Sequence, residues 1–261
     1  MKQLPVKKII QISFNKIKNN FKLFINVATV PFILILPFYL YSYYYDEFVL
    51  DLFNEEGMIS FIRGSTITKL FNYLILFPLT SAFLANWHRY VLFNGKRPWK
   101  FIPLDFSKYT FQFIWTAIKV GLIFIIPAFA FMGLIFWLSF NFFGMGLFYF
   151  GIVFYIVVAI VYFVRISLIF PATAAEEKNS MKRIFKLTKN SFWQLFLVYI
   201  SFIGLLFLFL IAFFILETIY PSTGSIITTL IYAGFTLFYT FIAYGYLATC
   251  ISESYKYLKK R

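Results

Sequence analysis

Arg165 is the most unusual residue of this sequence, because packing alone does not explain a charged side chain at its position. It lies in the apolar stretch VYFVRISLIFP, six residues before Pro171. A charged side chain at membrane depth costs several kcal/mol unless it is paired or reaches the interface. Three interpretations are open. Arg165 contacts an anion or a lipid headgroup, it pairs with Glu176 or Glu177 as the chain turns, or its side chain extends to the nearby membrane surface.

A run of cations follows Arg165 along the chain. Apolar residues recur through this run at spacings that place them on one helix face, and the cations occupy the other face. The cations are Lys182, Arg183, Lys186 and Lys189. The pattern predicts a helix in the plane of the membrane surface, with its charges toward lipid phosphates. These four residues and Arg165 are therefore candidate headgroup contacts. In the alternative interpretation they only anchor the helices.

Residue types that commonly carry catalysis or bind metals are scarce. The chain has one histidine, His88, and one cysteine, Cys250. One of each cannot build an ordinary zinc site or an internal disulfide, and His88 has no acidic neighbour in sequence. No phosphate-binding loop, dinucleotide fingerprint or hydrolase motif occurs. The sequence therefore predicts no enzyme activity, no metal and no cofactor.

Composition places the chain in a membrane. Of its 261 residues, 61% are hydrophobic and 24% aromatic, and the mean hydropathy is +0.80. Soluble domains are about 45–50% apolar, so much of this chain must be dissolved in lipid. The formal net charge of +14 comes from lysines and arginines beside the apolar segments. This placement favours anionic phospholipids as partners and argues against nucleic acid.

Six apolar segments are long enough to cross the bilayer as helices, which need about 20 residues. They cover residues 24–43, 70–90, 120–140, 147–170, 195–215 and 226–246. The predicted fold is an all-α membrane protein with six transmembrane helices and one domain, residues 1–261. In it, residues 1–23 form a basic amphipathic helix, 24–246 the six-span bundle, and 247–261 a basic tail.

The distribution of lysine and arginine predicts the orientation. The N-terminal arm, the second and fourth connections and the C-terminal tail are rich in both. The first connection is acidic, and the third and fifth, residues 141–146 and 217–224, contain neither. Positive charge marks the cytoplasmic side. We therefore expect a multi-pass protein of the bacterial inner membrane with both termini in the cytoplasm.

A short pattern recurs before each odd-numbered span. Lysine precedes phenylalanine by three residues in KNNFKLF, KYTFQFI and KNSFWQLF, which begin at Lys18, Lys108 and Lys189. The pattern predicts three helical hairpins, each preceded by an amphipathic helix on the cytoplasmic face. Chance is the competing explanation, because the chain is rich in both residue types.

The stretch of residues 165–196 resembles the membrane domain attached to some bacterial glycerophosphoryl diester phosphodiesterases, and related six-span bacterial families. The matching positions are Arg165, Pro171, Glu176, Thr188, Phe192 and Trp193. In those phosphodiesterases a separate soluble barrel carries the chemistry, and this chain has no room for that barrel. The resemblance therefore implies a non-catalytic membrane module.

These observations favour a non-enzymatic membrane protein that organises lipids or other membrane proteins. Two alternatives remain. A small-solute transporter or channel would need a polar path, for which the candidates are Arg165, Asn72, Asn86, Thr240 and Tyr244. A membrane-bound lipid-modifying enzyme would need several ionisable groups at one depth.

Overall fold

The computed structural model describes residues 4–50, 55–95, 107–177, 181–219 and 226–260, and for residues 39, 41–50, 55–73, 143 and 226 it describes the backbone alone. This part of the chain contains helices and no strands, so the all-α prediction is confirmed there. The helices are α1 (Val6–Asn19), α2 (Phe21–Leu50), α3 (Glu55–Phe93), α4 (Lys108–Leu138), the π-helix η1 (Ser139–Phe143), α5 (Met145–Ile166), α6 (Ile169–Ala174), α7 (Met181–Thr188), α8 (Phe192–Ile219) and α9 (Ile226–Lys259).

Five helical stretches of the described residues are long and apolar enough to cross a membrane. They are Phe21–Phe38, Lys108–Phe142, Met145–Ala174, Phe192–Ile219 and Ile227–Lys259. The shortest has 18 residues, which at about 1.5 Å per residue covers about 27 Å of bilayer. The chain is therefore a multi-pass membrane protein. The predicted second span, residues 70–90, lies in α3 and is not among the five.

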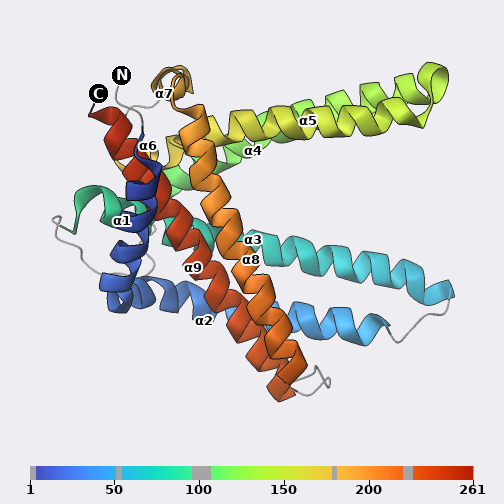
Figure 1. Ribbon diagram of the computed structural model, residues 1–261. Coiled ribbons are helices and arrows are strands. Elements are labelled where there is room, and N and C mark those ends of the chain that lie inside the picture. Colours follow the sequence, from blue (N-terminus) through green and yellow to red (C-terminus); the bar gives the residue numbers. More distant parts are fainter. Residues whose placement is uncertain (1–3, 51–54, 96–106, 178–180, 220–225, 261) are drawn as a thin grey trace.

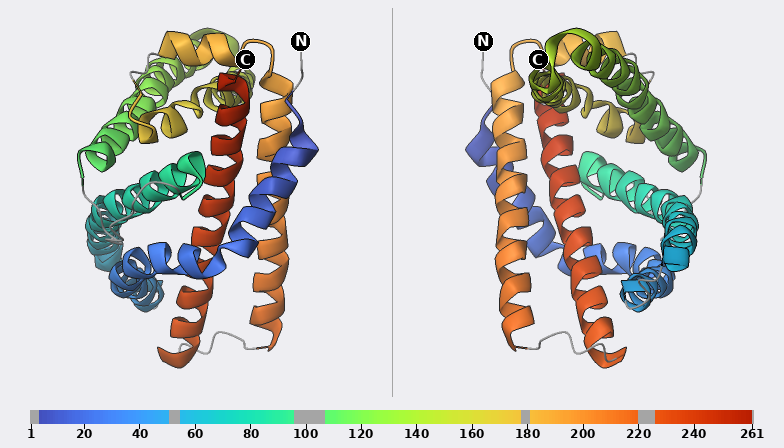
Figure 2. Two further views of the ribbon diagram at one scale, coloured as in Figure 1. Left: turned by 90° about the vertical axis from the view of Figure 1, so that its left-hand side faces the viewer. Right: turned by 90° about the vertical axis from the view of Figure 1, so that its right-hand side faces the viewer.

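The long helices lie in pairs (Figure 1). α2 packs along α3, α4 along α5, and α8 along α9. Gly144 forms the turn between η1 and α5. Its φ is 71°, a value that glycine adopts at little energetic cost because it has no Cβ. Figure 2 shows that the α8–α9 pair diverges from the other two pairs.

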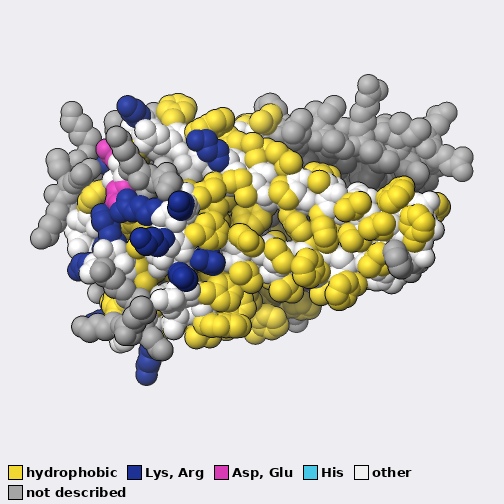
Figure 3. Space-filling view, turned by 90° about the horizontal axis from the view of Figure 1, so that it is seen from above, with side chains coloured by type: hydrophobic (Ala, Val, Ile, Leu, Met, Phe, Trp, Pro, Cys, Tyr) yellow, Lys and Arg dark blue, Asp and Glu magenta, His cyan; other side chains and the backbone are white. Residues whose placement is uncertain are grey.

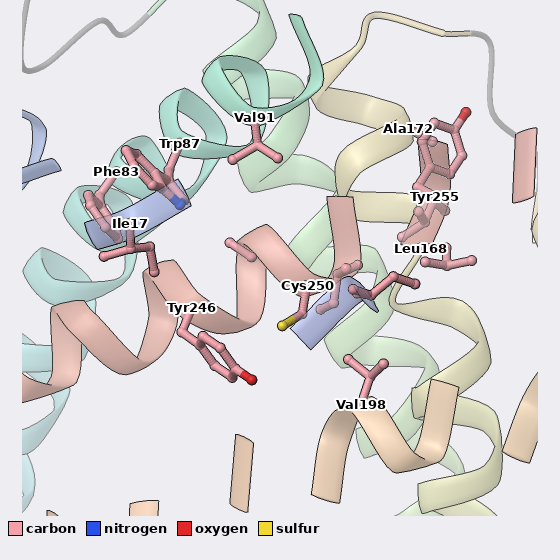
Figure 4. Close-up of a cluster of buried hydrophobic side chains, with 14 of the residues drawn as sticks. Ile17, Phe83, Trp87, Val91, Leu168, Ala172, Val198, Tyr246, Cys250 and Tyr255 are labelled. Carbon is pink, nitrogen blue, oxygen red and sulfur yellow. The ribbon is translucent and has the colours of Figure 1, made fainter. Parts of the chain in front are cut away.

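The largest cluster of buried side chains lies near the two termini, where α1, α3, α6, α8 and α9 meet (Figure 4). The spans in α4, α5 and α8 bury only 6%, 11% and 11% of their most apolar stretch. Their side chains therefore face lipid rather than protein. In Figure 3, lysine and arginine gather at the end that holds both termini, and hydrophobic side chains cover most of the remaining face.

Two of the predicted boundaries differ in the structure. α1 ends at Asn19 and α2 begins at Phe21, so the N-terminal helix is shorter than residues 1–23. The run that begins at Lys108 is the first part of α4 and not a separate helix. Hydropathy marks where a segment can enter lipid, but helix ends depend on local backbone breaks that hydropathy does not report.

Residues 247–261, predicted as a basic tail, are helical as far as Lys259. Cys250, Ile251, Tyr255 and Leu258 are buried there at exposures of 0–6%. Their spacing follows one face of a helix, and the lysines lie between them. The lysine content of this segment conceals an apolar face that belongs to the core.

Candidate functional site

Arg165, in the last turn of α5, is bonded to the C-terminal end of α7. Its Nε donates to the Thr188 hydroxyl at 3.2 Å, and its Nη2 donates to the Phe185 carbonyl at 2.8 Å. Its guanidinium also lies 4.8 Å from the centre of the Phe185 ring. The last carbonyls of a helix lack partners within the helix and carry partial negative charge, so a cation there is favourable. Arg165 therefore holds α7 against α5.

We expect Arg165→Gln to release α7. Hydrogen bonds from a charged group contribute about 1.5–3 kcal/mol, and glutamine cannot reproduce the paired geometry. Amide hydrogen exchange of residues 181–189 should become faster in detergent, while exchange in α9 stays unchanged. Lys186→Gln, an exposed change on α7 itself without a carboxylate partner among the described residues, is the control for charge. Equal protection of residues 181–189 in the wild type and Arg165→Gln would show that the bonds to Phe185 and Thr188 are not needed.

Glu176 and Glu177 follow the end of α6 in a backbone turn. The Glu177 N–H donates to the Ala172 carbonyl, and the Glu176 N–H donates to the Thr173 carbonyl. Glu176 has a φ of 60°, at the position where helix ends favour glycine. Its carboxylate accepts a hydrogen bond from Nη1 of Arg89, which lies 3.9 Å over the Tyr109 ring. This contact joins the end of α6 to α3.

Glu177 connects two further helices. It accepts hydrogen bonds from Lys259 of α9 and, at 3.2 Å, from Arg183 of α7. Burial raises the pKa of its carboxyl, but hydrogen bonds from Lys259 and Tyr255 and the charges of Lys259 and Arg183 outweigh burial. The pKa of Glu177 therefore lies below its usual value, and the charged form is favoured.

The predicted site residues thus separate into two groups. Arg165 contacts Thr188 and Phe185, and Arg183 contacts Glu177, so these cations hold helices together. Lys182, Lys186 and Lys189 are exposed, while Ile184 on the same helix is fully buried. Among the described residues, no carboxylate lies within salt-bridge distance of these three lysines. They remain available to a ligand.

Sequence reasoning missed a second group of cations. The Nζ atoms of Lys16 and Lys256 both contact Glu253 Oε1, at 2.7 and 3.1 Å, and both donate to the carbonyl of Val91 and the side chain of Asn94. The two ammonium groups thereby cap the end of α3. With Lys8 and Lys260 they line a cavity of about 760 Å³. The pair Asn94–Gly95 is typical of a helix end, and it is the sequence signal that could have indicated this capping site.

His88 and Cys250 take part in packing. His88 Nδ1 lies 2.7 Å from the Ser252 hydroxyl, and both residues are buried. Neither lines the cavities described for this protein. Cys250 is fully buried. Within the described ranges, no three side chains of the histidine, cysteine, aspartate or glutamate type are grouped for a metal.

The residues proposed for a solute path do not contact one another in the hydrogen bonds of the described residues. Asn86 is buried and accepts a hydrogen bond from Tyr109, and Thr240 donates to Thr236 of its own helix. Tyr244 is 39% exposed on α9. The side chain of Asn72 lies outside the described residues. The contact of Asn86 joins α3 to α4 and that of Thr240 stays within α9, so these two contacts do not join.

No protein-family model, no curated protein and no solved structure matches this chain.

Proposed function

We propose that this chain is a non-enzymatic protein of the bacterial inner membrane that binds anionic phospholipids and organises lipids or partner proteins at its cytoplasmic face. The observation that carries the proposal is a set of three exposed lysines, Lys182 and Lys186 on α7 and Lys189 directly after it, which have no carboxylate partner in the described part of the chain. Each lysine near an anionic surface contributes about 1 kcal/mol of attraction.

The attachment of α7 supports the proposal. Arg165 holds its C-terminal end and Glu177 holds Arg183, so Lys182 and Lys186 project from a helix that is fixed at both ends, and Lys189 directly follows that helix. A fixed helix loses less conformational freedom on binding than a mobile segment. Arg165 then acts as a positioning residue for α7, and the headgroup contacts belong to the exposed lysines.

The proposal includes six spans in three hairpins, in which α3 is the second span along the chain and adds to the five stretches named above. Both termini lie in the cytoplasm. The pairing of α2 with α3, α4 with α5 and α8 with α9 supports the hairpins, and the cations beside the termini support the orientation. The contact between Arg165 and Thr188 joins two positions of the phosphodiesterase-like stretch. Kinship with that membrane domain is part of the proposal.

Charge reversal on α7 tests the lipid contact. We expect Lys182→Glu, Lys186→Glu and Lys189→Glu together to weaken the preference for phosphatidylglycerol over phosphatidylcholine by on the order of 100-fold, because three attractive contacts of about 1 kcal/mol each are lost. The measurement is the lipid composition retained around the purified protein after extraction from mixed vesicles. Arg183 is left in place because it pairs with Glu177.

The matched control replaces the same three lysines with arginine, which keeps the charge, and it should retain the preference. An unchanged preference in the glutamate variant would reject α7 as the headgroup contact. Increasing salt should also weaken the wild-type preference, since exposed charges are screened over about 10 Å at 0.1 M ionic strength.

A further inference from the structure

A groove lies between α1, α8 and α9, apart from α7. Its volume is about 970 Å³. Its apolar lining includes Ile10, Phe14 and Phe21 from the N-terminal helices and Leu205 and Leu208 from α8. Phe14 and Phe21 are 61% and 44% exposed. The groove is therefore an apolar surface that the described protein leaves uncovered.

The groove is long enough to hold part of an acyl chain. Its lining residues on α8 run from Ser201 to Leu208, a length of about 10 Å at 1.5 Å per residue. Gly204 lies within this stretch, and a Cβ placed on it would meet no atom within 4 Å. The absence of a side chain at Gly204 keeps the groove open in its middle.

The polar residues of the groove indicate which class of lipid it holds. Ser201 and Tyr246 bond to each other at 3.1 Å, and Ser201 also donates to the Val198 carbonyl, so this pair needs no ligand. Lys18 lines the groove, is exposed, and has no carboxylate partner among the described residues. Lys22, one turn further along the chain, is also exposed. Positive charge beside an apolar groove complements an anionic headgroup with its acyl chain.

We infer that the groove holds one anionic phospholipid, with an acyl chain between α1, α8 and α9 and its phosphate beside Lys18. An acyl chain gains little by leaving a bilayer for another apolar surface. The charge at Lys18 therefore sets the headgroup preference, and the open space at Gly204 sets whether a chain enters. This site goes beyond the proposed function, because it uses none of the lysines of α7.

The test fills the groove without disturbing the fold. Gly204→Leu places a side chain in open space and improves helix propensity, so the protein should fold. Gly133→Leu on α4 is the matched control, because its added Cβ also meets nothing within 4 Å and it lies outside the groove. Detergent-solubilised proteins are titrated with dioleoyl phosphatidylglycerol or dioleoyl phosphatidylcholine, and bound lipids are counted by native mass spectrometry.

The wild type and Gly133→Leu should each retain one tightly bound phosphatidylglycerol, and Gly204→Leu should lose it. Lys18→Gln should bind phosphatidylglycerol about fivefold more weakly, with phosphatidylcholine unchanged. Equal phosphatidylglycerol binding by Gly204→Leu and Gly133→Leu would overturn the inference, as would equal binding of the two lipids by the wild type.

The experiments distinguish failure of the proposed function from failure of the groove site. The glutamate variant of α7 should keep the single phospholipid of the groove while it loses headgroup preference at the membrane surface. If that variant keeps its surface preference and Gly204→Leu loses the bound phospholipid, the proposed function fails and the groove site stands.

Discussion

Gly245→Ala is expected to open the core near the termini and expose Cys250 to thiol reagents. A Cβ at position 245 would lie 2.3 Å from Cε2 and 2.9 Å from Cζ of Phe24. Phe24 is fully buried and held edge-on by Phe83 and Trp87, with ring centres 5.7 and 4.9 Å away. The Phe24 ring therefore cannot move aside without displacing both neighbours. Overpacking of this kind costs about 1–3 kcal/mol, and more where neighbours are rigid.

The sequence provides a reporter for this effect. Cys250 is the one cysteine of the chain and is fully buried. Labelling of its thiol by a maleimide in detergent should therefore follow opening of the core. Gly245→Ala should be labelled about tenfold faster than the wild type, which corresponds to about 1.4 kcal/mol. Gly234→Ala, on the same helix and with open space at its added Cβ, should label at the wild-type rate. Equal rates for Gly245→Ala and Gly234→Ala would contradict the close approach of α2 to α9.

Trp87→Ala is expected to cause the largest loss of stability. The Trp87 indole is fully buried, and its Nε1–H donates to the Thr249 hydroxyl at 2.8 Å and the Gly245 carbonyl at 3.0 Å. Its ring also stacks on Tyr90 at 5.2 Å. Removing a buried tryptophan costs about 3–5 kcal/mol, since the cavity collapses only in part. In a chain of this size the unfolding midpoint should fall by on the order of 10 °C.

Trp137→Ala is the comparison for lipid-facing tryptophan. Trp137 lies on α4 and is 55% exposed, so its loss should shift the midpoint by only a few degrees. Trp87→Phe separates ring packing from the hydrogen bonds and should cost about 1–3 kcal/mol, because the Thr249 and Gly245 acceptors lose their donor. If the Trp87 and Trp137 alanine variants unfold at the same temperature, the claim that Trp87 is part of the stabilising core is wrong.

Hydropathy predicted the location of the apolar helices but not the location of the core. The segments at residues 147–170 and 195–215 lie in the two most hydrophobic helical stretches of the described residues, yet each of these stretches buries only 11% of its most apolar part. Tyr255 and Leu258, which lie among lysines, are buried. Lipid and protein interiors favour the same side chains, so composition cannot distinguish a lipid-facing surface from a packed one.

The candidate site was predictable where its residues are close in sequence. Arg165 stood out because a charge in an apolar run is costly, and the cations of α7 stood out by their spacing. The partners of Arg165 at Phe185 and Thr188 could not be found, because they depend on how the chain turns after α6. Lys16 and Glu253 are 237 positions apart, and no local pattern connects them.

The contact between α1 and α9 constrains the order in which the protein can mature. α1 buries Ile9, Ser13 and Ile17, and it contacts α2, α8 and α9. A ribosome makes α1 before α8 and α9, so in the nascent chain α1 lacks two of these three neighbours until α8 and α9 follow. Its apolar side must rest on the bilayer surface in the meantime. A ribosome that stalls before α9 therefore leaves α1, α2 and α3 without the helix that all three contact.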